Sequence, residues 1–196
     1  MFAWFNNRQP CQGCMATAIT GSFYLTETVA LPVASPANTN VTGTLDLSAY
    51  VNVPTGQAIA IESVDFIFQD GSDYSSSVGL MLAGNGALTV QLTDLNPAGI
   101  FVRADNHSLV ASGALNIDTA NNIGTHTSDL YPDNFGPAAH SESFMVVNDS
   151  LYLTAGNQVS AIAGSVVYVS VRVRCRVVKL STKDWMAIAI QSTAEA

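Results

Sequence analysis

Apolar and polar residues alternate with a period of two along most of this chain. In residues 23–31, for example, Leu25, Val29 and Leu31 share one face, whereas Thr26 and Thr28 share the other. A period of two is that of a β-strand with one buried face. The same pattern predicts further strands at 41–47, 57–69, 78–83, 87–93, 100–103, 107–117, 143–147, 151–154 and 158–180.

Turn-forming sequences separate these stretches, among them DGSDYSSS, GNG, NPAG and ADN. Many short strands, frequent turn signals and almost no helical periodicity favour an all-β fold, a two-sheet antiparallel sandwich. The number of strands favours a jelly roll in which the chain crosses between the two sheets. An immunoglobulin-like sandwich is the alternative, but the inter-sheet cysteine pair and core tryptophan of that fold have no counterpart here.

Three segments depart from simple alternation. In 57–69 the apolar residues change face near Glu62 and Ser63, which predicts a β-bulge or a strand bent between two sheets. Residues 118–142 are polar and are expected to form a long loop. The last segment, 181–196, fits two structures: Ser181 and Asp184 could begin a helix, but Trp185 and its neighbours also alternate, and we favour a strand.

The chain of 196 residues is 48% hydrophobic and only 11% charged, with a formal net charge of -8. This composition excludes a disordered polyelectrolyte and disfavours a freely diffusing nucleic-acid binder, which would be basic. No apolar run is long enough to span a membrane. We expect one sandwich domain, 21–196, preceded by an N-terminal arm, 1–20.

The few cations are concentrated near one strand. Arg172, Arg174 and Arg176 lie on one face of the 158–180 stretch, opposite a run of valines, and Lys179 and Lys183 follow closely. Three counter-charges are conceivable for this basic stripe. They are carboxylates of neighbouring strands, an acidic surface of another subunit, or nucleic-acid phosphates.

The candidate carboxylates on neighbouring strands are Glu27, Glu62 and Asp65.

Candidate chemistry is otherwise sparse. Cys11 and Cys14 are spaced like half a zinc site, which Cys175 and one of His107, His126 or His140 would have to complete. The 118–142 loop and the Asp70–Asp73 turn contain oxygen and nitrogen ligands, but neither matches a complete metal-binding motif. We therefore expect no metal, no cofactor and no catalytic residue, and we interpret the protein as a non-enzyme.

The start of the chain, MFAWFNNRQP, is apolar and aromatic at Phe2, Trp4 and Phe5. It is too short in its apolar part, and its arginine comes too late, for a secretory signal. The segment could fold against its own domain. The alternative that we carry forward is an arm that packs on a neighbouring subunit.

The arm 1–10, the succession of strands from Phe23 onward and the long arginine-bearing strand 166–180 together resemble single jelly-roll viral capsid and virion structural proteins. The resemblance implies a virion location and self-assembly through the flanks of the sandwich and the arm. It implies copies of the chain itself and other virion proteins as partners. The chain lacks the strongly basic N-terminal tail of many coat proteins, so nucleic acid is not the favoured partner.

The competing interpretation is a secreted β-sandwich that binds carbohydrate or a cell surface, with Trp185, Tyr131 or Tyr74 as a stacking platform.

Overall fold

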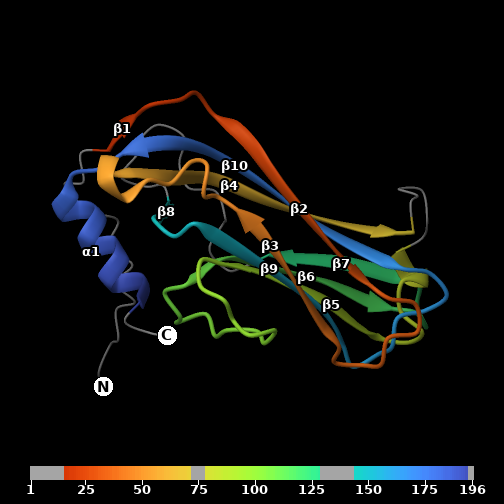
Figure 1. The fold of residues 1–196 in the computed structure, drawn as a ribbon. Helices are drawn as coiled ribbons and strands as arrows, with labels where there is room; N and C mark the ends of the chain where they lie inside the picture. The colour runs from red at the N-terminus through yellow and green to blue at the C-terminus, as the bar shows by residue number, and fades with distance from the viewer. Residues whose placement is uncertain (1–15, 72–77, 129–143, 194–196) are drawn as a thin grey trace, which may run out of the picture.

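A computed structural model describes residues 16–71, 78–128 and 144–193 of the chain as two β-sheets packed face to face, with a short helix at one end (Figure 1). The strands are β1 (Thr17–Ala18), β2 (Phe23–Leu31), β3 (Asn40–Asp46), β4 (Gln57–Asp70), β5 (Gly86–Thr93), β6 (Leu109–Asp118), β7 (Ile123–Ser128), β8 (Phe144–Val146), β9 (Ser150–Gln158) and β10 (Val167–Lys179). Two 3-10 helices, η1 (Val53–Thr55) and η2 (Val78–Leu80), and the helix α1 (Thr182–Thr193) complete the described chain.

The order of the strands is that of a jelly roll. One sheet has the order β2–β10–β4–β8, with β1 continuing the β2 edge along β10, and the other has the order β3–β9–β5–β6–β7. All these pairs are antiparallel. The chain crosses from one sheet to the other after β2, β3 and β4 and again after β7, β8 and β9. Eight strands thus form two four-stranded layers, and β7 is an addition to β6.

The core lies between the two layers and is formed by the inward side of the alternating pattern. Leu31, Ile61, Leu92, Leu153 and Val171 are among its fully buried members. Burying each such side chain contributes about 1.5–3 kcal/mol, so the period-two pattern is what holds the sheets together. A second, smaller cluster joins α1 to the sheet end, where Ala58, Ala60, Val147, Val178 and Leu180 are buried.

The β-bulge that the sequence predicted lies at Glu62. Along β10 the pairing passes from Arg174 opposite Ser63 to Cys175 opposite Ile61, so Glu62 is the extra residue of β4. The inserted residue restores the phase of the strand, and Ile61 and Val64 therefore both face the core. The apolar residues of β4 thus remain on one side of a single sheet, and the alternative of a strand bent between two sheets is wrong.

Several predicted elements differ from the structure. Residues 181–196 were expected to continue as a strand, but 182–193 form α1. The hydroxyl of Ser181 accepts a hydrogen bond from the Asp184 backbone N–H at 3.2 Å and so caps the first turn. Within the expected loop 118–142, residues 123–128 instead form β7, which pairs with the end of β6.

The expected strand at 78–83 is wrong as well, because it begins with the η2 turn and contributes a single bridge, Leu82 to Ile162. The expected strand at 100–103 is an irregular segment. Its Val102 exchanges two hydrogen bonds with the side chain of Gln91, at 2.8 and 2.9 Å, which satisfy the backbone without a strand partner.

Candidate interaction surfaces

The arginine stripe lies on the outer face of the β2–β10–β4–β8 sheet, as the alternation predicted. Val171, Val173 and Cys175 are buried in the core, and the arginines at the intervening positions point to the other side. Thr26 and Thr28 of β2 lie beside this stripe and are exposed.

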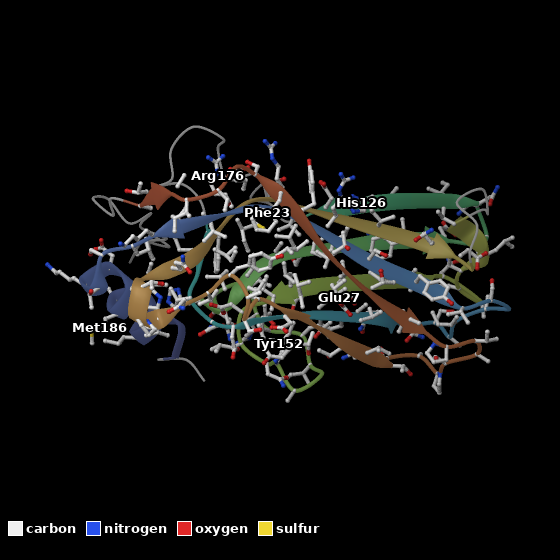
Figure 2. The ribbon with its side chains drawn as sticks, turned by 45° about the horizontal axis from the view of Figure 1, so that its top comes forward. Phe23, Glu27, His126, Tyr152, Arg176 and Met186 are labelled. Atoms are coloured by element: carbon white, nitrogen blue, oxygen red, sulfur yellow. The ribbon has the colours of Figure 1, made fainter. Side chains whose placement is uncertain are left out.

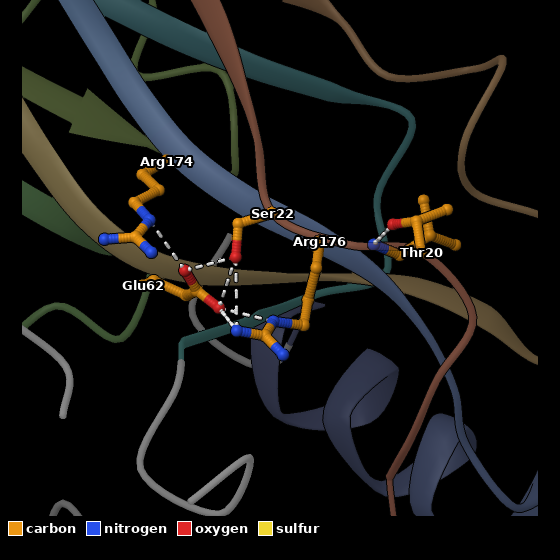
Figure 3. A network of polar contacts seen from close by, with 6 residues as sticks. Thr20, Ser22, Glu62, Arg174 and Arg176 are labelled. Carbon is orange, nitrogen blue, oxygen red and sulfur yellow. Dashed lines mark hydrogen bonds and ion pairs between the residues drawn. The ribbon is translucent and has the colours of Figure 1, made fainter. Parts of the chain in front are cut away.

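Glu62 is the counter-charge of two of these arginines (Figure 3). Its carboxylate forms an ion pair with Arg174 Nε at 3.1 Å, and an ion pair and a hydrogen bond with the Arg176 guanidinium. Ser22 donates its hydroxyl to the same carboxylate at 2.9 Å and accepts from Arg176 at 3.2 Å. The bulge places Glu62 on the arginine side, where its side chain is only 6% exposed.

Arg172 is held differently. Its guanidinium carbon lies 4.1 Å from the centre of the Tyr24 ring, a cation–π contact, and Asp65 of β4 is its register partner. Of the three carboxylates proposed from the sequence, Glu62 is thus confirmed and Asp65 lies opposite an arginine. Glu27 is wrong, because it stands on the inward side of β2 between Leu25 and Val29.

Lys179 and Lys183, the other two predicted members of the basic region, are exposed, one at the end of β10 and one in the first turn of α1. Arg174 keeps a side-chain exposure of 45%, despite its ion pair. What remains on this face for a partner is therefore the exposed part of Arg172 and Arg174, because Lys179 is at a position of β10 that alternates with the arginines and Lys183 belongs to α1.

A second surface lies at the end of the sandwich opposite α1 (Figure 1). Four connections meet there, 32–39, 78–85, 119–122 and 159–166, and we call them the apolar loop end. None of the residues in these four ranges is charged, although the whole β4–β5 connection, 71–85, also contains Asp73, which lies outside the described residues. Four large apolar residues of these connections and one at the start of β7 are exposed: Val33 (48%), Val78 (37%), Leu80 (63%), Ile123 (52%) and Val159 (78%).

Hydrogen bonds between the connections hold the apolar loop end together. Ala163 N–H donates to the Met81 carbonyl at 3.0 Å, and Ile162 N–H donates to the Ser35 carbonyl at 3.0 Å. The buried side chain of Asn157 donates to the carbonyls of Pro36 and Ser160 at 2.9 and 2.8 Å. The exposed apolar side chains therefore stand on a fixed backbone. Sequence reasoning missed this surface, although the lack of charge in four separate turns was a signal for it.

Helix α1 provides a third surface. Trp185, Ile188 and Ala189 pack against the small cluster at the sheet end, together with Ala16. Met186, 55% exposed, lies on the side that faces away from the sandwich (Figure 2). Since Trp185 packs inward, it does not form the exposed stacking platform that the carbohydrate-binding interpretation required; Tyr74 and Tyr131 lie outside the described residues.

The residues considered for metal binding are not brought together in the described part of the chain. Cys175 is fully buried in the core, where burial and the nearby charge of Glu62 raise the pKa of its thiol to about 12. The His126 ring lies edge-on to Phe68 at 6.2 Å, and Asp70 accepts a hydrogen bond from Ser165. Within residues 16–71, 78–128 and 144–193, no group of three or more His, Cys, Asp or Glu side chains could hold a metal ion.

Several sequence candidates fall outside the described residues. They are Cys11, Cys14, Asp73, Asp129, Asp133, His140 and Glu142, and the arm residues Phe2, Trp4 and Phe5. The described helices include none that is long and apolar enough to cross a membrane.

No protein-family model and no curated protein sequence matches the chain. Among solved structures, it is similar to Merkel cell polyomavirus VP1 in complex with disialyllactose, at 10% identity and a TM-score of 0.37, covering 83% of this chain and 98% of that one. Apo chimpanzee polyomavirus VP1 is similar at 11% identity and a TM-score of 0.38, with the same coverage. Turnip yellow mosaic virus is similar at 10% identity and a TM-score of 0.30, covering 83% and 96%.

These neighbours are viral capsid proteins, as the resemblance in the sequence suggested. Because the three TM-scores lie below 0.5, the similarity carries no weight for function, and the proposal below is argued from this chain's own residues.

Proposed function

We propose that this protein is a structural subunit of a virion, a capsid or capsid-associated protein that self-assembles and catalyses no reaction. The observation that carries the proposal is the apolar loop end. A jelly roll is also used by lectin domains and by cupins, so the fold alone does not choose between these functions.

The apolar loop end has the properties of the centre of a protein–protein interface. Such centres are depleted in charged residues, and contiguous exposed apolar surface usually marks an interaction site. Leu80 and Val159 are 63% and 78% exposed, and the described ranges 32–39, 78–85, 119–122 and 159–166 around them contain no charged residue. Their fixed backbone reduces the entropy that binding would cost.

The outer face of the β2–β10–β4–β8 sheet supports the same function. Burying an unpaired charge in a subunit contact is costly, but two of the three arginines on this face already have Glu62 as their partner. A flank of the sandwich can therefore lie against another subunit at a lower desolvation cost. The proposed assembly uses these flanks and the N-terminal arm, and its partners are copies of the chain and other virion proteins.

Light scattering after size exclusion and negative-stain imaging of the purified protein test this function. We expect closed rings or shells from the unaltered chain. The double variant Leu80→Glu, Val159→Glu should stay monomeric, with the circular dichroism and melting temperature of the folded chain. The matched control is Ile100→Glu, which makes the same type of change at a residue that is 64% exposed on the β5–β6 connection, and this variant should still assemble.

Two results contradict the proposal. One is an unaltered protein that remains monomeric at the highest attainable concentration, and the other is a double variant that assembles as well as the control. A clean monomer that binds immobilised glycans would instead support the secreted binding module.

A further inference from the structure

Helix α1 is apolar on more sides than its contacts in the described chain account for. From Trp185 to Thr193 it has no charged residue, and its two charges, Lys183 and Asp184, both lie in the first turn. A helix that is hydrophobic all round is normally buried all round. Here one side packs on the sheet end, while Met186 and Ile190, one turn apart, are 55% and 64% exposed.

Ala16, the first described residue, lies beside this helix, because it packs in the same small cluster as Trp185 and Ile188. β1 follows immediately and pairs with the last residues of β10, just before α1 begins. The segment that precedes Ala16 contains Phe2, Trp4 and Phe5, side chains of the type that would fit against a methionine and an isoleucine.

We propose that the outer side of α1, formed by Met186, Ala187 and Ile190, is the docking site for the N-terminal segment of a neighbouring copy, with Phe2, Trp4 and Phe5 as its anchors. This inference rests on the proposed function and names the surface that receives the arm. Met186 points away from its own sandwich (Figure 2), so this side of α1 is accessible to a second copy. The ten residues between Phe5 and Ala16 reach up to about 36 Å, enough to span to an adjacent helix.

Each copy would then give one arm and receive one. Such an exchange of identical elements would join copies in addition to the contact at the apolar loop end. It would also link the two ends of the chain, because the donor of the contact is the N-terminus and its receptor is the last described helix.

Disulfide trapping between separately purified variants tests the docking site. In a background with Cys11 and Cys14 replaced by serine, one population carries Ala3→Cys and the other Ala187→Cys. The remaining Cys175 is fully buried. After mixing and mild oxidation, we expect a heterodimer on a non-reducing gel. The matched control replaces Ala187→Cys by Thr26→Cys, an equally exposed thiol on the outer sheet face, and should give no heterodimer.

A second pair of variants tests the anchors. Adding Met186→Ser and Ile190→Ser to the Ala187→Cys chain should lower the heterodimer yield about tenfold, the change expected from about 1.4 kcal/mol of lost contact. A yield equal to that of the control, or a disulfide found only within single chains of an Ala3→Cys, Ala187→Cys variant, overturns the proposal. If rings or shells form but the heterodimer is absent from the gel, this docking site is wrong and the proposed function stands. If no assemblies form, the proposed function is contradicted. In that case the presence or absence of the heterodimer still tests the contact between the arm and α1.

Discussion

The buried carboxyl of Asp94 should make the folded chain less stable as the pH rises. This residue, just after β5, is 4% exposed, and its Oδ1 has no hydrogen-bond partner. Its backbone is satisfied, because its N–H donates to Ser108 at 3.0 Å and its carbonyl accepts from Asn148 at 3.0 Å. Burial without a compensating charge raises the pKa of the Asp94 carboxyl from 3.8 to about 7.

The sign and the size follow from proton linkage. The folded chain holds this proton more tightly than the unfolded chain does, so the folded state loses stability as the pH rises from about 4 to about 7. A difference of about 3 pKa units corresponds to roughly 4 kcal/mol, most of which is lost between pH 4 and pH 8. The loss is an upper value, because local relaxation or water entry would reduce it.

The Asp94→Asn variant removes this titration while keeping the shape of the side chain. The free energy of unfolding of both proteins can be measured by urea unfolding at pH 4 and pH 8. Between these pH values, the unaltered chain should lose up to about 4 kcal/mol more than the variant does. The comparison between pH values matters, since the new amide can itself cost about 1–3 kcal/mol at every pH. Parallel pH profiles of the two proteins would refute the burial argument.

Three other predictions concern single side chains. Glu62→Gln should lower the free energy of unfolding by about 1–3 kcal/mol, because both arginines lose their charged partner and can still reach water. In urea denaturation, adding Arg176→Met to this variant should lower the free energy of unfolding by less than Glu62→Gln did. With the two N-terminal cysteines replaced by serine, Cys175 should not react with a thiol reagent until the chain unfolds, since its pKa of about 12 keeps it protonated, and fast labelling of the native protein would contradict its burial. Asp118→Asn should shift the pH dependence in the direction opposite to Asp94→Asn. Hydrogen bonds from Asn121 lower the pKa of the Asp118 carboxyl, so its contribution is present above the unfolded pKa and is lost as the pH falls, and melting temperatures at pH 3 and pH 7 measure it.

The strands with a full period-two pattern were predictable because burial of one face decides their conformation. β2, β3 and β5 formed where the alternation placed them, and the bulge at Glu62 was visible as a change of phase. The strand predicted at 158–180 is shorter, because 159–166 form a connection and β10 begins at Val167. Helix α1 was not predictable in this way. Its sequence WMAIAI is apolar at successive positions, so it has no period, and only the Ser181 cap distinguishes a helix from a strand.

β7 was missed because its conformation comes from pairing with β6 and not from its own residues, which are mostly polar. The surfaces were likewise predictable only where the sequence of one element determines them. The arginine stripe could be derived from a single strand, whereas the apolar loop end exists only because four connections distant in sequence meet in space. Glu27 is a wrong candidate even by the alternation of β2, which places it on the same face as Leu25 and Val29, and this face turns inward.

The bulge at Glu62 also determines how β4 can align with β10. The apolar residues on the two sides of Glu62 are in opposite phase, so only the alignment with the extra residue at this point buries Ile61 and Val64 together. A slip of β4 by one residue would turn its core side chains to solvent. A slip by two residues, with the extra residue still at Glu62, would keep the same side chains buried but would move the Glu62 carboxylate away from Arg174 and Arg176. The ion pairs of Glu62 therefore distinguish the observed alignment of β4 and β10 from others that bury the same faces.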